Sequence, residues 1–217
     1  MNTATATTNT ALPVSEDLSP ADARALYRDE LTLGEARALY FARTGFDEGT
    51  YFADDIELPV SFAGATRIVR LPNIAARKAA VRVHDLSHVL TGYGTTWLGE
   101  FQISAFEIGM GCRGYWAAWV LNAGGLAGGV VRAPAKMLRA FARGRRTSRS
   151  LYAIVPVWDD AILERHVGGL RREVGVHDDV DPTRTDVVLF GVAAIATWGF
   201  HLAPFAIAVA GLFAAFG

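Results

Sequence analysis

Residues 72–100 read PNIAARKAAVRVHDLSHVLTGYGTTWLGE, and the interpretation of the whole chain begins from this stretch. Apolar residues recur at helical spacing over about 72–90, which predicts one amphipathic helix. Gly92 and Gly94 interrupt that pattern, and a second helix is expected over about 96–121. The stretch therefore predicts two helices joined by a tight glycine turn.

The first of these helices carries two histidines, His84 and His88, one helical turn apart. Residues four apart share a helix face, so both imidazole rings can bind one cation. Glu100 follows twelve residues after His88, and the glycine turn lets the second helix bring its carboxylate back to the pair. Asp85 is expected either to bind the cation directly or to hold a ligating ring by its N–H. Such a set of donors suits zinc, iron or manganese and often leaves open positions for a substrate.

Other interpretations of these residues are weaker. A histidine pair at this spacing also occurs on helices that bind no metal. HD-type phosphohydrolases need a further histidine upstream, and no histidine precedes His84. Zinc proteases with the H-E-x-x-H motif have a glutamate directly after the first histidine, where this chain has Asp85. The single cysteine, Cys112, excludes an internal disulfide and is expected to be a small buried residue rather than a nucleophile.

The remaining sequence also favours helices. Ser19 followed by Pro20 is typical of a helix start, and the first helix is expected at about 20–31. Residues 46–65 are interpreted as a loop and residues 122–129 as a glycine-rich break. Further helices are expected at about 33–44, 130–143 and 159–174. No strand-rich block is predicted, so the expected fold class is all-α.

Charge is distributed very unevenly along the chain. The 217 residues carry a net charge of −1, but residues 1–60 carry −7, residues 61–150 carry +10 and residues 151–186 carry −4. Residues 187–217 contain no Asp, Glu, Lys or Arg. A basic middle beside an uncharged tail favours contact with an anionic membrane, and nucleic acid is not an expected partner.

The uncharged tail is long enough to cross a membrane. Its 31 residues exceed the roughly 20 that one span needs. We expect residues 187–217 to insert as one helix or, if Pro204 divides them, as a helical hairpin; the alternative is a buried core helix. A basic row upstream is expected to face anionic headgroups. It comprises Arg132, Lys136, Arg139, Arg143, Arg145, Arg146 and Arg149.

The expected domain organisation follows from these patterns. Residues 1–18 are expected to be disordered, residues 19–178 to form the helical domain, and residues 187–217 to form the membrane segment. The first fourteen residues lack the basic residues of a secretory or organelle signal. The expected location is therefore the cytoplasmic side of a bacterial inner membrane, with the tail as the anchor.

The histidine motif resembles that of a known family. The run His84-Asp85-Leu86-Ser87-His88, followed by eleven residues and then Glu100, is similar to the HDxxH-(x11)-E motif of the ubiquinone (coenzyme Q) biosynthesis protein 4 family. Residues 170–176 are similar to the end of that family, so the resemblance covers roughly residues 70–176. The tail that follows departs from the family pattern.

This resemblance implies a helical domain that binds a divalent cation, zinc in the family, and that holds a polyprenyl lipid in an apolar cavity. It implies His84, Asp85, His88 and Glu100 as the metal ligands and the catalytic residues. The implied reaction is the lyase-type, oxidative decarboxylation at C1 of a polyprenylated hydroxybenzoate ring in ubiquinone biosynthesis. The implied partners are the polyprenylated quinone precursor and other ubiquinone-biosynthesis proteins. The tail adds the membrane or a membrane complex as an expected partner, and a homo-oligomer is a further expectation.

Two further functions stay open from the sequence. One is a non-catalytic scaffold that presents prenylated intermediates to other enzymes. The other is a structural subunit of a membrane complex that uses the tail as its anchor. The intact set of four motif residues favours the enzyme and the scaffold, because a purely structural subunit has no need of metal ligands.

Overall fold

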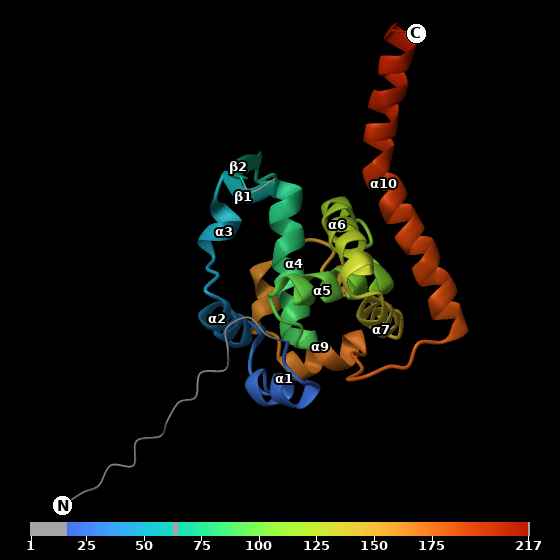
Figure 1. The fold of residues 1–217 in the computed structure, drawn as a ribbon. Coiled ribbons are helices and arrows are strands. Elements are labelled where there is room, and N and C mark those ends of the chain that lie inside the picture. Colours follow the sequence, from blue (N-terminus) through green and yellow to red (C-terminus); the bar gives the residue numbers. More distant parts are fainter. Residues whose placement is uncertain (1–16, 63–64, 217) are drawn as a thin grey trace, which may run out of the picture.

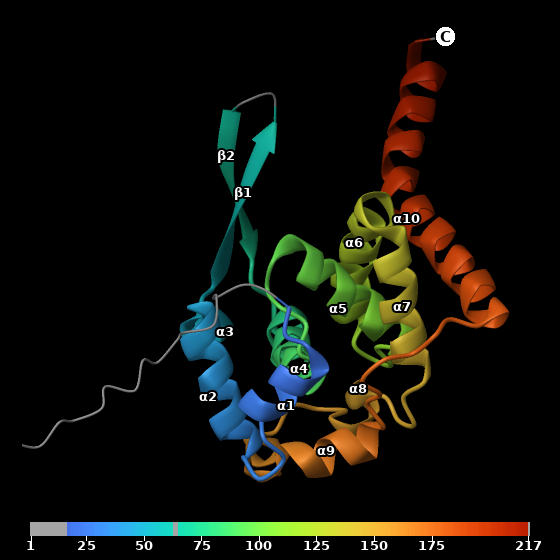
Figure 2. The same ribbon diagram turned by 60° about the horizontal axis from the view of Figure 1, so that its bottom comes forward.

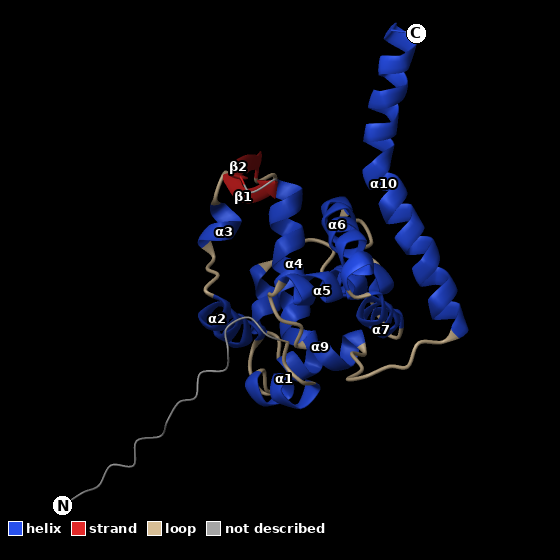
Figure 3. Cartoon of the chain, viewed as in Figure 1, coloured by secondary structure: helices blue, strands red, loops and turns tan. Residues whose placement is uncertain are grey.

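The structure, a computed structural model, describes the backbone of residues 17–62 and 65–216 (Figure 1). Helices dominate it and confirm the expected all-α class, with one two-stranded hairpin added (Figure 3). Most of the expected disordered segment 1–18 lies outside the described residues. The elements are α1 (Pro20–Leu26), α2 (Leu33–Thr44), α3 (Gly49–Phe52), β1 (Asp55–Phe62), β2 (Ala65–Pro72), α4 (Ala75–Thr91), α5 (Trp97–Met110), α6 (Trp116–Arg132), α7 (Pro134–Arg145), α8 (Leu151–Ile154), the short 3-10 helix η1 (Asp160–Glu164), α9 (Val167–Val174) and α10 (Arg184–Phe216).

Helix α4 runs through the middle of the helical body (Figure 1). Its apolar side chains Val83, Leu86 and Val89 are fully buried, so α4 is the centre of the main hydrophobic core. It ends at Gly92, which adopts a left-handed conformation with φ of +79° and donates its N–H to the His88 carbonyl oxygen. This is the glycine turn that the sequence predicts. Helix α5 then starts at Trp97, and the Thr96 side chain caps it by accepting from the Gly99 N–H.

The predicted helix over 96–121 and the predicted break over 122–129 are both wrong. Helix α5 ends at Met110 and is capped by Gly111, and α6 continues through the glycine-rich residues without interruption. A Cβ built on Gly125 would lie 2.1 Å from Ser104 Oγ of α5. The glycines of α6 therefore permit close packing of two helices, a role that local sequence does not distinguish from a break.

Helices α5 and α7 cross with their backbones in contact. A Cβ on Gly109 of α5 would lie 2.2 Å from the Phe141 carbonyl oxygen, and a Cβ on Gly144 of α7 would lie 1.9 Å from the Phe106 carbonyl oxygen. Any side chain at either position would push the two helices apart. This crossing fixes where α5 lies relative to the rest of the body.

The hairpin of β1 and β2 corrects the interpretation of residues 46–65 as a loop. The two strands pair antiparallel, and Figure 2 shows the hairpin extending away from the helices. Ile56, Leu58 and Val60 alternate with other residues, which is the period of a strand. Pro59 obscures that signal, although both strands of a two-stranded sheet are edges, where a residue without an N–H is tolerated.

Helix α10 is a single helix and not a hairpin, and its far end projects away from the body (Figures 1 and 2). It is the one helix of the described chain that is long and apolar enough to cross a membrane, and only 11% of its Arg184–Ala203 window is buried. The alternative of a buried core helix is therefore excluded for that window. His201 in this helix donates from Nδ1 to the Thr197 carbonyl oxygen at 2.7 Å.

The start of α10 is fastened to α7 through one aspartate. Asp186 is fully buried at its side chain and pairs with both Arg145 and Arg146 at 2.8 Å. Its carboxylate also accepts from the N–H and hydroxyl of Thr183, which caps the helix. Phe190 packs its ring against Phe141 of α7 at 5.7 Å.

These and neighbouring contacts pair or bury four of the seven residues of the expected basic row. Arg143 is buried and donates to the carbonyl oxygens of Thr91 and His177. Arg149 pairs with Glu173. With Arg145 and Arg146 bound to Asp186, the row is left with Arg132, Lys136 and Arg139 as its exposed, unpaired members in the described structure.

We expect Gly144→Ala to lower the free energy of unfolding by about 1–3 kcal/mol, because the added methyl group overlaps the backbone of α5. Gly169→Ala in α9 is the matched control. A Cβ there meets nothing within 4 Å, so it should leave stability unchanged or raise it by up to about 1 kcal/mol. Chemical denaturation of the two variants measures the difference, and equal stabilities would contradict the close crossing of α5 and α7.

Candidate metal centre

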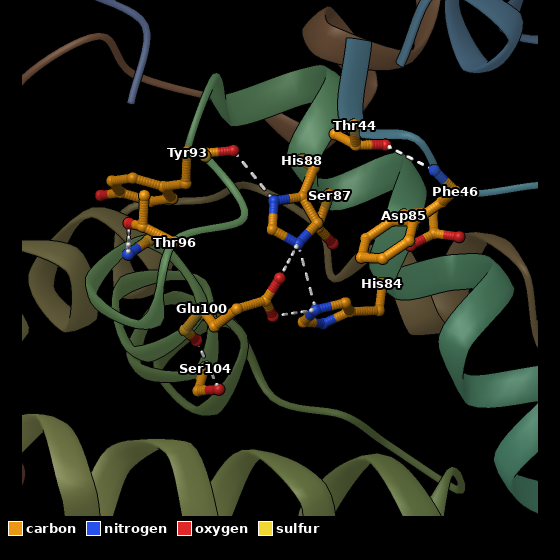
Figure 4. A network of polar contacts seen from close by, with 12 residues as sticks. Thr44, Phe46, His84, Asp85, Ser87, His88, Tyr93, Thr96, Glu100 and Ser104 are labelled. Carbon is orange, nitrogen blue, oxygen red and sulfur yellow. Dashed lines mark hydrogen bonds and ion pairs between the residues drawn. The ribbon is translucent and has the colours of Figure 1, made fainter. Parts of the chain in front are cut away.

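Three of the four predicted site residues bring their ligand atoms together (Figure 4). The Nε2 atoms of His84 and His88 lie 3.2 Å apart. The Glu100 carboxylate places Oε2 3.3 Å from His84 Nε2 and Oε1 3.6 Å from His88 Nε2. Helix α4 supplies the two imidazoles and α5 the carboxylate, so the predicted return of Glu100 to the histidine pair is confirmed.

The outer nitrogens of both rings are held by hydrogen-bond acceptors. His88 Nδ1 donates to the Tyr93 carbonyl oxygen at 2.9 Å, and His84 Nδ1 donates to Glu107 Oε2 at 3.0 Å. A neutral imidazole with a proton on Nδ1 has a lone pair on Nε2. Two lone pairs and a carboxylate that face one another repel unless a positive charge lies between them. The three residues could therefore hold a metal ion.

Glu107 supports this centre and was missed by the sequence analysis. Its side chain is fully buried and accepts four hydrogen bonds. The donors are His84 Nδ1 at 3.0 Å, Ser87 Oγ at 2.6 Å, Asn122 Nδ2 at 2.7 Å and the Tyr152 hydroxyl at 2.8 Å. An ionised carboxylate has about four acceptor sites, so this one is saturated. The available signal was its spacing of seven residues from Glu100, which places both on one face of α5.

The charges of this cluster depend on one another. Burial raises the pKa of the Glu107 carboxyl, but the His84 ring and the donated hydrogen bonds outweigh burial and hold that pKa below its ordinary value. Burial lowers the pKa of His84, whereas Glu107 and Glu100 raise it well above its ordinary value. The two carboxylates thus favour positive charge at the point where the imidazole nitrogens meet.

Asp85 is not part of the converging group. Its carboxylate is buried and accepts hydrogen bonds from the hydroxyls of Tyr51 and Tyr40, the latter at 3.4 Å. The Tyr40 ring stacks on His88 with centroids 5.4 Å apart. Asp85 is therefore linked to the centre through Tyr40, whose ring packs against a ligand ring.

Two of the three converging residues line a cavity of about 920 Å³, and the buried His88 lies behind them. His84 and Glu100 form part of its wall, with Glu107, Asn122 and Tyr152 also among its lining residues. Aromatic side chains supply much of the rest: Tyr40, Phe41, Phe46, Tyr51, Trp97 and Phe101. Cys112 is buried as expected, and burial raises the pKa of its thiol, which makes it a poor nucleophile.

Comparison with known proteins found no matching family model, no matching curated protein and no matching solved structure.

Two variants, Asp85→Asn and Glu100→Gln, distinguish a metal centre with three protein ligands from one with four. We expect Asp85→Asn to retain about one metal ion per chain, because its carboxylate faces two tyrosines. Glu100→Gln should weaken metal binding more than the roughly 10–100-fold typical of an outer partner. Elemental analysis and competition with a chelator measure both, and metal loss in Asp85→Asn alone would identify Asp85 as the ligand.

Glu107→Gln should weaken metal binding about 10–100-fold, because the amide no longer attracts the His84 N–H as a carboxylate does. Gln102→Glu, which adds a carboxylate elsewhere on α5, serves as the control for altered charge on this helix. Titration with a chelator gives the affinities, and thermal melts show whether the variants are folded. Unchanged affinity in a folded Glu107→Gln protein would show that Glu107 has no part in orienting His84.

Proposed function

We propose that this protein binds zinc through His84, His88 and Glu100 and catalyses C1 decarboxylation of a polyprenylated hydroxybenzoate ring. The observation that carries the proposal is the meeting of two imidazole lone pairs and a carboxylate at the wall of a large, aromatic-lined cavity. The motif that resembles the ubiquinone biosynthesis protein 4 family supplies the substrate class.

The distances between the ligand atoms favour zinc. A tetrahedral ion with ligands about 2.0–2.1 Å away keeps their atoms roughly 3.3–3.4 Å apart. The three separations of 3.2, 3.3 and 3.6 Å are close to that value. Three protein ligands leave a fourth position for a substrate oxygen, which is the usual arrangement of catalytic zinc.

The cavity suits a large aromatic lipid. Its volume of about 920 Å³ exceeds that of a single ring, and its aromatic lining favours stacking against one. Trp97 is largely exposed and Phe46 about half exposed where they line the cavity, so an isoprenoid chain can leave past them.

In this reaction the bond between C1 and the carboxylate carbon breaks, carbon dioxide leaves, and a proton takes its place at C1. A bound divalent cation supplies Lewis acidity that stabilises negative charge on the ring oxygen as carbon dioxide departs. Glu107 holds His84 in the required tautomer, and Tyr40 and the Tyr93 carbonyl oxygen hold His88. The oxidative form of the reaction places a hydroxyl at C1 instead and consumes an oxidant such as dioxygen.

One observation favours the scaffold alternative: most carboxyl groups that line the cavity are already engaged in contacts. Asp85 and Glu107 are occupied by donors, and Glu100 belongs to the metal group. Asp47, exposed at the cavity, is then the remaining carboxyl among the lining residues of the described structure. A cavity that binds the lipid without reacting with it would need no acid to deliver a proton.

The protein is proposed to work on the cytoplasmic face of a bacterial inner membrane with α10 as its anchor. Apart from His201, the exposed side chains of α10 are apolar over Val187–Leu202, and α6 beside it exposes Trp116, Trp119 and Val120. A Cβ on Gly124, at the cavity, would lie 3.7 Å from His201 Nε2 of α10. The cavity is thus separated from α10 by one wall, which favours exchange of lipids with the bilayer.

Lipid analysis of a deletion strain tests the reaction. A strain that carries His88→Ala in place of the wild type should accumulate a carboxylated prenyl intermediate and form no ubiquinone, because one ligand is lost. His177→Ala, an exposed histidine away from the cavity, is the control and should restore ubiquinone. Loss of ubiquinone without a carboxylated intermediate would support the scaffold, and full complementation by His88→Ala would refute both.

Extraction experiments test the anchor. The full chain should resist extraction by high salt and carbonate. Val192→Arg combined with Ile195→Arg should release it, because a charge near the centre of a span costs about 2.5–3.5 kcal/mol. Both positions are exposed, at 59% and 76%, so the body should stay folded. Val157→Arg, at an exposed position of the body, is the control, and release of the wild-type protein by salt alone would contradict anchoring.

A further inference from the structure

We propose that Arg77 forms a binding site for the carboxylate of an aromatic acid, at a point in the cavity separate from the metal centre. The proposal rests on the proposed function and deepens it by naming the group that selects the ligand. Arg77 lines the same cavity as His84 and Glu100. It precedes His84 by seven residues, two helical turns, which is about 10 Å along the axis of α4.

The guanidinium of Arg77 is oriented but incompletely paired. Its Nη1 donates to Asn73 Oδ1 at 2.8 Å, and Asn73 is itself buried and donates to the Ala53 carbonyl oxygen at 2.9 Å. Nε is buried with no hydrogen-bond partner among the described residues. A buried N–H without an acceptor is costly, so this side chain is held in place with donor capacity left over.

The charge of the cavity makes Arg77 the natural position for an acid. Four carboxylates line the cavity, those of Asp47, Asp85, Glu100 and Glu107, whereas Arg77 is the one arginine or lysine among the lining residues of the described structure. Asp85 is nearest to it in sequence on the same helix, but its oxygens accept from two tyrosine hydroxyls. Among the protein's own side chains, an anionic ligand is repelled by these carboxylates and attracted at Arg77. A bound divalent cation would be the second positive charge of the cavity, so the test has to separate the two.

These positions define a ligand with two polar ends. A carboxylate on the Arg77 guanidinium can form charge-assisted hydrogen bonds of the kind that arginine makes with planar anions. A hydroxyl at the opposite end of the same ring then points toward His84 and Glu100. The aromatic lining residues of the cavity can stack on the faces of such a ring. The cavity therefore selects aromatic acids over neutral phenols of the same shape.

The test compares one acid with its neutral ester. The probes are 4-hydroxybenzoate with a single isoprenyl group and the methyl ester of the same compound, titrated into zinc-loaded full-length protein in detergent. The wild type should bind the acid more tightly. Arg77→Met should weaken binding of the acid roughly tenfold or more while leaving the ester unchanged. Arg77→Lys should give an intermediate preference, because it keeps the charge but not the planar fork.

Controls separate this site from the metal centre and from damage to the fold. Lys78→Met removes a neighbouring charge from α4 outside the cavity and should not change the preference for the acid. The acid-to-ester ratio is independent of the fraction of folded protein, so a poorly folding variant still gives an answer. The preference should survive removal of zinc by a chelator.

Three results would overturn the proposal. They are equal binding of acid and ester by the wild type, loss of the preference on zinc removal but not in Arg77→Met, and competition by inorganic phosphate as strong as by the acid. Equal binding would mean that the cavity does not select the carboxylate, and loss on zinc removal would mean that the carboxylate binds the metal; both leave the proposed function standing. Strong competition by phosphate would assign Arg77 to phosphate binding. A wild type that binds neither probe would overturn the proposed function together with this site.

Discussion

A carboxylate buried away from water must be surrounded by donors, and the arrangement of the site depends on how Glu107 meets this requirement. Its four donors come from α4, α6 and α8, while Glu107 itself belongs to α5. One side chain therefore ties four helices to a single arrangement. The same contacts fix the His84 tautomer, so one set of hydrogen bonds both stabilises the fold and orients a metal ligand.

The position of α5 is equally constrained from its other sides. It lies against α6 and α7 at distances that only glycine permits at Gly125, Gly109 and Gly144. Because α5 carries both Glu100 and Glu107, a shift of this helix would move one carboxylate toward the histidines and change the bonds of the other. Close backbone packing, which leaves little freedom, thus determines the distance between the imidazoles and the acid that faces them.

Local features of the sequence predicted local structure well. The helix over 33–44 ends at Gly45 as expected, and the histidine pair, the glycine turn and the return of Glu100 follow from spacing within 25 residues or fewer. The structural features that could not be predicted from the sequence depend on contacts between residues far apart in the chain. The burial of Arg143 needs Thr91 and His177, the glycines of α6 need α5, and Asp85 turns away from the centre because Tyr51 and Tyr40 are there to meet it.

The attachment of α10 through Asp186 makes this helix a lever. A helix of 33 residues is about 50 Å long, so a rotation of roughly 10° at its base would displace the far end by about 9 Å. Asp186 is held by Arg145, Arg146 and the Thr183 cap, which resist such a rotation from several directions. If the far end is fixed in a bilayer, the same geometry acts in reverse: the stiffness of this joint sets the height and tilt at which the body stands above the membrane.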